Sequence, residues 1–279
     1  MNGNYQDKLT RAKKAIKGAD AVLIGGGAGL SAAAGLVYGG ERFYSNFKEF
    51  IGQYGMMDMY SAGFYPFKTQ EEKWAYWSRH IKLNRFDPEA GEVYLKLFEL
   101  VKDKDYFVIT TNVDAQFYKA GFDPEKVFAV QGDYGKLQCA GGCHNKLYDN
   151  ETLVRQMVSG QKKCRIPSHL VPHCPECNGL MDINLRKDYA FVQDEEWYQS
   201  SRRYTAFISR IMNRKLSLLE LGVGYNTPTI IRFPFEEITA QTPNATLIRI
   251  NKDYPEAGKI NLRKTIAFEN DIAEIMAVL

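Results

Sequence analysis

The chain has 279 residues, of which 45% are hydrophobic and 25% are charged, a balance typical of folded rather than disordered proteins. Its formal net charge is only +3, and it has no basic run, which argues against a nucleic-acid-binding protein. The longest apolar stretch, residues 21–37, is rich in glycine and alanine, and the first residues lack the apolar core of a signal peptide. We therefore expect a cytoplasmic protein that does not bind or cross a membrane.

Short apolar runs recur along the chain and have the character of buried strands. The first run is at 20–24 and ends in the glycine-rich sequence GGGAG. The others occupy residues 106–112, 126–132, 216–224, 247–251 and 265–270. A final helix is expected to begin at Asp271, a favourable N-cap residue. Because helix-length segments separate the runs, the sequence predicts an α/β fold with a doubly wound, Rossmann-like parallel sheet.

Two segments interrupt this alternation of strands and helices. Residues 37–100 are rich in aromatic side chains at helical spacing and have no strand pattern, which predicts a helical insertion. Residues 134–187 hold all five cysteines, which predicts a smaller zinc-binding lobe, because so short a loop-rich segment needs a metal ion to hold it together. With no repeat or low-complexity linker between them, we expect one domain over residues 1–279 that carries both insertions.

The glycine loop after the first run is a candidate for binding a dinucleotide. It follows a strand and opens a helix, so backbone N–H groups and the helix dipole can meet a diphosphate at Gly27, Ala28, Gly29 and Ser31. The acidic residue that usually binds the ribose about 20 positions later is not obvious. The alternative is a turn whose glycines serve only close packing of a strand against a helix.

Four of the five cysteines form two close pairs, Cys139 with Cys143 and Cys174 with Cys177. Two such knuckles supply four thiolates for a tetrahedral zinc ion, and a closed set of this kind is structural rather than catalytic. The alternative, four buried thiols, gives no reason for the paired spacing. Three nearby histidines could compete as ligands: His144, His169 and His173.

Polar residues follow two of the predicted strands, where ligands of open α/β sheets bind. One group is the segment TTNVD, with Asn112 and Asp114, and the other is QGD, with Gln131. These residue types also end strands for turn chemistry alone. If the two strands are neighbours, the two groups lie at the same edge of the sheet.

Together these motifs resemble those of the sirtuin family. GAGLSAAAG resembles the sirtuin loop GAG-x-S-x-x-x-G, TTNVD resembles T-Q-N-x-D, and VQGD stands where sirtuins carry a His-Gly pair. The paired cysteines follow as in the sirtuin zinc module, and LGVGYNTP, RINKD and END resemble later cofactor-binding segments. The resemblance implies NAD as co-substrate and a structural Zn²⁺ ion. It implies these cofactor-binding residues: Gly27, Ala28, Gly29, Ser31, Gly35, Asn112, Asp114, Gln131, Gly222, Gly224, Asn251, Lys252 and Asp271.

The departures from the family pattern point to a subgroup. Gln131 replaces the histidine that acts as general base in sirtuin deacylases, Arg186 stands where the apolar acyl-lysine channel begins, and VYGGERF replaces P-D-F-R. This combination resembles the class M (macrodomain-linked) sirtuins. It implies protein ADP-ribosylation of a lipoylated carrier similar to the glycine-cleavage H protein, and a macrodomain hydrolase that reverses the modification.

The resemblance assigns catalytic roles to four residues. Asn112 is expected to orient the ribose or a water, and Asp114 to fix either the nicotinamide amide or Asn112. Gln131 is expected to bind the ribose hydroxyls without accepting a proton, and Arg186 to dock an acidic acceptor. The alternative for Arg186 is a solvated surface charge. The alternatives for the whole protein are a deacylase that tolerates Gln131 and an NAD-sensing module without turnover.

Overall fold

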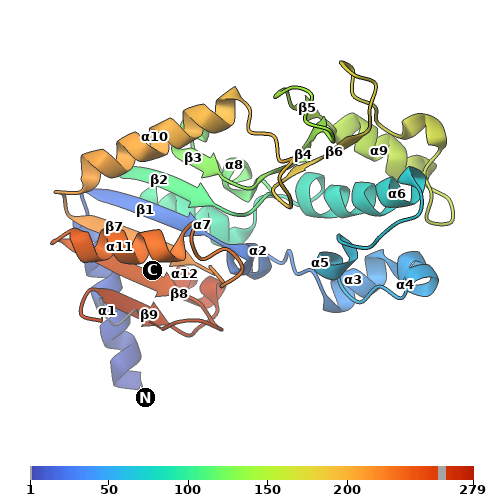
Figure 1. The fold of residues 1–279 in the computed structure, drawn as a ribbon. Helices are drawn as coiled ribbons and strands as arrows, with labels where there is room; N and C mark the ends of the chain where they lie inside the picture. Colours follow the sequence, from blue (N-terminus) through green and yellow to red (C-terminus); the bar gives the residue numbers. More distant parts are fainter. Residues whose placement is uncertain (1, 257–261) are drawn as a thin grey trace. The chain divides into compact units, whose positions relative to one another are not determined.

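The computed structural model describes residues 2–256 and 262–279, drawn as a ribbon in Figure 1. The chain divides into two compact units. The first, here called the sheet unit, comprises Met1–Gly35, Ala90–Gln131 and Glu195–Leu279. The second, here called the insertion unit, comprises Leu36–Glu89 and Gly132–Asp194.

Within its described residues, the sheet unit contains one six-stranded parallel sheet, in the order β3-β2-β1-β7-β8-β9. The strands are β1 (Ala21–Gly26), β2 (Asp105–Thr110), β3 (Val127–Ala129), β7 (Leu216–Leu221), β8 (Ala245–Ile250) and β9 (Thr265–Phe268). All six overlap the runs predicted from the sequence, and the doubly wound α/β fold is confirmed. Since the strands are parallel, the loops that follow them all leave the sheet at its carboxyl edge.

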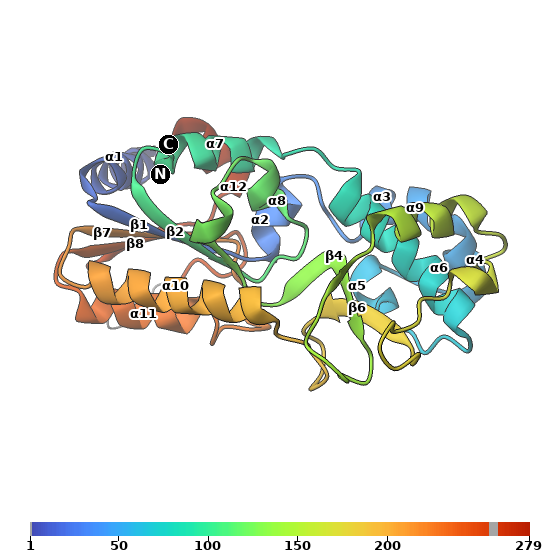
Figure 2. The ribbon, with the colours of Figure 1, turned by 90° about the horizontal axis from the view of Figure 1, so that it is seen from above.

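Helices cover both faces of this sheet, as Figure 2 shows. Alternate residues of each strand serve the two faces: Val22 and Ile24 pack into one hydrophobic cluster, and Ala21 and Leu23 into the other. The first face is covered by α1 (Asn2–Gly18), α2 (Ala28–Ala33), α7 (Glu92–Val101), α8 (Gln116–Lys119) and α12 (Ile272–Val278). The second is covered by α10 (Glu195–Ile211) and α11 (Arg232–Gln241), and a short 3-10 helix, η2 (Pro124–Lys126), precedes β3.

A buried ion pair lies within the second face. Glu220 on β7 and Arg249 on β8 are register partners and are both fully buried. The Arg249 guanidinium donates from Nε and Nη2 to the two Glu220 carboxylate oxygens, at 2.8 Å each. Burial raises the pKa of Glu220, although Arg249 and Arg232 oppose that shift. Because neither charge is in contact with water, removing one partner leaves the other charge buried and uncompensated.

We expect Arg249→Met to lower the free energy of unfolding by about 3–5 kcal/mol. The control is Arg210→Met, which breaks a partly exposed pair with Asp105 and should cost about 1 kcal/mol or less. Urea unfolding of both variants measures the difference. Equal losses in the two variants would contradict a dominant role for the buried pair.

The insertion unit combines helices with a small antiparallel sheet. Within its described residues, three strands pair in the order β5-β4-β6, with bounds β4 (Gly132–Cys139), β5 (Tyr148–Asp149) and β6 (Met181–Leu185). Its helices are α3 (Gly40–Asn46), α4 (Lys48–Tyr54), α5 (Met59–Ala62), α6 (Gln70–Ile81), the π-helix η1 (Lys82–Phe86), α9 (Glu151–Gly160) and the 3-10 helix η3 (Ser168–Leu170). The sequence analysis did not predict this sheet.

Aromatic side chains form the centre of the helical part. The ring of His80 lies 5.0 to 5.3 Å, centroid to centroid, from those of Tyr38, Trp77 and Tyr134. Burial lowers the pKa of His80 to about 3, so the imidazole is neutral at physiological pH. Trp77 and His80, which lie in the aromatic-rich segment singled out in the sequence, are therefore core residues of the insertion unit, as is Tyr134.

The bounds expected for the two insertions need correction. The helical insertion was expected to run to residue 100, but α7 belongs to the sheet unit, because Val93, Tyr94 and Leu97 pack into the core beside β1. The expected helical and zinc-binding segments also form one compact unit rather than two separate additions. Among the described helices, none is long and apolar enough to cross a membrane.

Candidate functional site

The turn from β1 into α2 is fixed by close approach of backbone to backbone. A Cβ atom on Gly27 would lie 2.6 Å from the Gly222 carbonyl oxygen, and one on Gly29 would lie 2.7 Å from Gly222 Cα. Gly222 itself has φ +63° and would place a Cβ 2.5 Å from Gly29. Only glycine fits at these three positions, so the loops after β1 and β7 are locked together.

This packing reduces the number of backbone N–H groups in the glycine loop that can bind a diphosphate. The Gly27 N–H donates to Leu221 O and the Gly29 N–H to Gly222 O, both at 3.0 Å. The alternative of a packing turn therefore holds for these two amides, which already have acceptors. Ala28 is the first residue of α2, and an N–H at that position has no acceptor within its own helix. Of these three amides, that of Ala28 remains for an anion.

Asn112 and Asp114 are brought together with the glycine loop at the carboxyl edge of the sheet. Asn112 Nδ2 donates to Gly27 O at 2.9 Å. The buried Asp114 carboxylate accepts from Ser31 Oγ through one oxygen and from the Gln116 N–H, at 3.0 Å, through the other. Asp114, expected to fix either the nicotinamide amide or Asn112, is connected to Asn112 through Ser31 and a tyrosine.

That tyrosine, Tyr94, was missed by the sequence analysis. Its hydroxyl lies 3.1 Å from Ser31 Oγ and 3.2 Å from Asn112 Nδ2. It comes from α7, whose apolar spacing predicts a core helix, and its ring is fully buried. A tyrosine on such a stripe gives no sequence signal that its hydroxyl reaches polar partners.

The residues expected on the adenosine side have mixed surroundings. Asn251 is buried, donates to Val223 O at 2.8 Å and accepts from the Asp253 and Tyr254 N–H groups at 3.0 Å. Its side chain thus holds the loops after β7 and β8 together. Lys252 is exposed, and Asp271 caps α12 by accepting from the Ala273 N–H, as predicted.

Two of the expected glycines leave open space. A Cβ atom on Gly35 or on Gly224 would meet nothing within 4 Å. Gly35 has φ +86°, so its backbone conformation alone favours glycine. Gly224 follows the locked turn at Gly222 and lies in a loop where a ligand can approach the main chain closely.

Gln131 is the last residue of the sheet unit and is partly buried. Val130, just before it, donates its N–H to Thr110 O at 3.0 Å, which places this segment beside the end of β2. Gly132, just after it, has φ +99° and would place a Cβ 2.2 Å from Asn184 O. The backbone on both sides of Gln131 is therefore tightly constrained.

Arg186 lies in the insertion unit, directly after β6, and is exposed. Its neighbour Lys187 bonds Asp182 at 2.6 Å, and Lys73 bonds the same carboxylate at 3.0 Å. Burial opposes ionisation of Asp182, but the two lysines outweigh it and hold its pKa below the usual value. Within the described chain, no hydrogen bond or ion pair occupies the Arg186 guanidinium.

The four paired cysteines form one cluster. Their sulfur atoms all lie within 4.8 Å of one another, and the Cys139–Cys177 and Cys143–Cys174 pairs are each 3.7 Å apart. A tetrahedral zinc ion with Zn–S bonds of about 2.3 Å separates its sulfur ligands by about 3.8 Å, so the cluster fits zinc. A hydrogen bond from the Cys143 N–H lowers the pKa of Cys139 to about 6, which favours the thiolate.

The other candidate ligands are not members of the four-cysteine cluster. His144 lies beside it, with Nε2 3.4 Å from Cys174 Sγ and 3.2 Å from the Tyr148 hydroxyl. His169 and His173 are not members of the cluster, and neither is Cys164, which is buried elsewhere in the insertion unit. The closed four-thiolate set expected from the sequence is therefore present.

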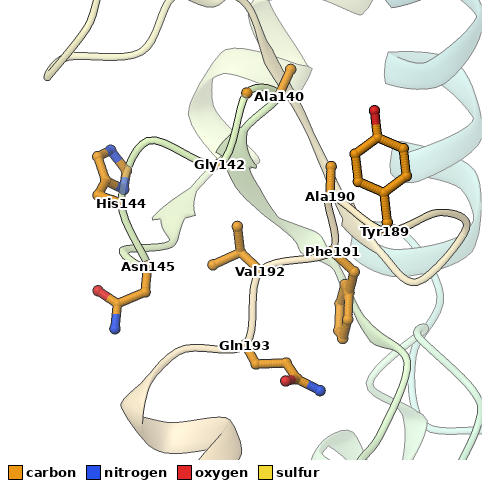
Figure 3. A pocket seen from close by; sticks show the side chains of 10 residues that line it. Ala140, Gly142, His144, Asn145, Tyr189, Ala190, Phe191, Val192 and Gln193 are labelled. Atoms are coloured by element: carbon orange, nitrogen blue, oxygen red, sulfur yellow. The ribbon is translucent and has the colours of Figure 1, made fainter.

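A cavity of about 710 Å³ adjoins the first cysteine knuckle (Figure 3). Its lining comes from two segments, residues 140–142 with His144 and Asn145, and residues 189–193, of which all but Gln193 are apolar or aromatic. His144 is the one histidine in its lining, and its ring lies against the Tyr148 hydroxyl and the Cys174 sulfur. The part of this cavity formed by residues 189–192 is therefore mainly apolar.

Comparison with known proteins decides the family. The Sir2 family profile matches residues 27–211. The chain belongs to the Sir2 family. A Staphylococcus aureus relative named protein ADP-ribosyltransferase is 39% identical over 265 residues, which cover 95% of this chain and 84% of the relative. A Fusarium oxysporum relative named probable bifunctional ADP-ribose hydrolase/ADP-ribosyltransferase is 32% identical over 90% of this chain, which spans 43% of that protein's length.

Solved structures agree on the Sir2 fold. A Sir2 homologue in complex with NAD has a TM-score of 0.61 at 17% identity, covering 96% of this chain and 90% of that one. A Sir2 protein bound to a myristoylated histone peptide has a TM-score of 0.57 at 16% identity, covering 98% and 94%. As a Sir2-family enzyme, the chain uses NAD as co-substrate, and its four-cysteine cluster fits a structural zinc ion.

We expect Cys174→Ser to lose the zinc ion and to lower the thermal stability of the insertion unit, because the ion ties two loop-rich knuckles together. Cys164→Ala is the matched control, since Cys164 lies outside the cluster, and it should keep about one zinc ion per chain. Metal analysis of the purified variants decides the matter. A Cys174→Ser protein with the zinc content of the wild type would refute the assignment.

Proposed function

We propose that this Sir2-family enzyme is an NAD-dependent protein ADP-ribosyltransferase whose acceptor is a lipoylated carrier protein similar to the glycine-cleavage H protein. The observation that carries the proposal is the 39% identity with a protein named protein ADP-ribosyltransferase, over 84% of that protein's length. The replacement of the expected histidine base by Gln131 supports transfer over deacylation.

Asn112 is the residue we assign to cleavage of the nicotinamide–ribose bond. Bound NAD supplies a ribose carbon that becomes electrophilic as nicotinamide departs with the bonding electrons. Because Gly27 O can only accept a hydrogen bond, the Asn112 amide must turn its NH₂ group toward it. The amide oxygen, Oδ1, is then free to orient a ribose hydroxyl or to face developing positive charge.

Gln131 fits a reaction that needs no general base. A glutamine side chain does not take up a proton near neutral pH, so it can bind a ribose hydroxyl but cannot deprotonate it. A carboxylate acceptor is already ionised: its oxygen forms the new bond to the ribose carbon as the bond to nicotinamide breaks, and no proton has to be removed. We therefore propose an acidic acceptor residue.

Arg186 is the residue we assign to that acceptor. Its planar guanidinium matches a carboxylate in two-point geometry. The Arg186 side chain is exposed and has no partner among the described residues. Its guanidinium N–H groups are therefore available to a second protein. The pairing of Asp182 with Lys73 and Lys187 anchors β6 and the first residue after Arg186.

We propose two protein partners for this enzyme, the lipoylated carrier and a hydrolase. The lipoyl arm of the carrier is apolar apart from its amide. We propose that the segment after β6, which differs from the acyl-lysine channel of deacylases, accepts this arm. The Fusarium relative is named for both an ADP-ribose hydrolase and a transferase activity, which supports a macrodomain hydrolase that removes the modification made by this enzyme.

We expect Arg186→Ala to bind NAD with an affinity within about threefold of wild type, but to lose ADP-ribosylation of the lipoylated carrier by about a hundredfold. Arg186→Lys should recover little of the transfer activity, since an ammonium group cannot make the two-point contact of a planar guanidinium with a carboxylate. Arg155→Ala removes another exposed arginine of the insertion unit and should label the carrier normally. Mass spectrometry of the carrier reports the transfer.

Two outcomes would overturn parts of this proposal. Equal labelling by wild type and Arg186→Ala would make Arg186 a solvated surface charge. Equal labelling of lipoylated and unlipoylated carrier would remove the lipoyl arm from recognition while leaving the transferase assignment intact.

A further inference from the structure

We infer that Tyr94 is a positioning residue, which acts with Ser31 to connect the Asp114 carboxylate to the Asn112 amide. The inference rests on the proposed function, because it assumes that Asn112 acts in nicotinamide release. It adds to that proposal a residue on α7, 18 positions before Asn112.

The Tyr94 ring is closely packed. It is fully buried in the core of the sheet unit, and it meets the Phe117 ring edge to face, with centroids 4.9 Å apart. This packing leaves the ring little rotational freedom. The hydroxyl is consequently held at a fixed point between Ser31 and Asn112.

One arrangement of the hydrogen atoms satisfies these three contacts together. An ionised Asp114 can only accept, so the single Ser31 hydroxyl hydrogen points to it. Ser31 Oγ must then accept from the Tyr94 hydroxyl. Since that hydrogen is used on Ser31, the Tyr94 oxygen accepts from Asn112 Nδ2. Three hydrogen bonds therefore run in one direction, from the Asn112 amide to the Asp114 carboxylate.

This directed chain has two effects on Asn112. First, Tyr94 and Gly27 O together bind both hydrogens of the Nδ2 group, which prevents the amide from flipping. Second, hydrogen bonds that end on a charge polarise one another. The bonds that the Asn112 amide donates from Nδ2 therefore shift electron density within the amide toward Oδ1. No described residue donates to Asn112 Oδ1, so this more negative oxygen is available to the ribose.

The chain also gives Asp114 a role that does not require contact with NAD. Its carboxylate is buried and held by Ser31 and the Gln116 N–H. Gln116 in turn accepts from the Gly91 N–H at 2.8 Å, just before α7 begins. The same few residues therefore fix the start of the helix that carries Tyr94 and the carboxylate to which Tyr94 is connected.

Tyr94→Phe tests the inference, because it removes the hydroxyl and keeps the buried ring. We expect kcat for nicotinamide release to fall by about tenfold to a hundredfold, while KM for NAD changes by less than about threefold. Tyr106→Phe is the matched control: Tyr106 is also buried in the sheet unit, and its hydroxyl accepts from the Asp123 N–H at 3.1 Å. It should lower stability to a similar extent, with kcat within about twofold of wild type.

Combination with Asn112→Ala separates a positioning role from an independent one. If Tyr94 acts through Asn112, adding Tyr94→Phe to Asn112→Ala should not slow the residual rate further, because the amide it positions is gone. A further loss equal to that of the single variant would overturn the inference, as would a Tyr94→Phe enzyme with wild-type kcat. If Tyr94→Phe keeps the wild-type kcat but Asn112→Ala lowers release to a small residual rate, the proposed function stands and only the inference fails. Wild-type release by Asn112→Ala would overturn both.

Discussion

The contact of Gly27 and Gly29 with Gly222 is the constraint on which the carboxyl edge of the sheet depends. These three residues bring two loop backbones closer than any side chain would allow. The contact uses the Gly27 and Gly29 amides and leaves Gly27 O pointing to Asn112. A methyl group at any of the three positions would push the β1 and β7 loops apart, and the orientation of the Asn112 amide would be lost with them.

Polar groups are fixed around this contact by neighbours that are themselves buried. Asn112 is tied to Gly27, Ser31 to Asp114, and Asn251 to Val223. Below the edge, the Glu220–Arg249 pair lies on adjacent strands in the core. Burying polar and charged side chains lowers the stability of the fold unless each group has a hydrogen-bond or ion-pair partner. Once paired, it holds side chains in one orientation, which a reaction at the ribose carbon requires.

Sequence reasoning located the main sheet because its strands are uninterrupted apolar runs that end in glycine or polar residues. It missed β4, β5 and β6, since a sheet that is partly held by metal ligands has no such pattern. It predicted the cysteine cluster from the paired spacing and proposed Asn112 and Asp114 from their place at a strand end. Of the two roles expected for Asp114, a contact with Asn112 is made indirectly, through Ser31 and Tyr94. Tyr94 could not be found, because its position on α7 predicts only packing.

The central claim is that chemistry at this site ends with transfer of ADP-ribose and does not proceed to deacylation, because Gln131 cannot remove the proton that deacylation requires. The most direct measurement is the product distribution when the unmodified enzyme is incubated with NAD and an acetyl-lysine peptide. The account predicts that the peptide keeps its acetyl group and that no acetylated ADP-ribose forms. Formation of acetylated ADP-ribose in step with nicotinamide release would contradict it.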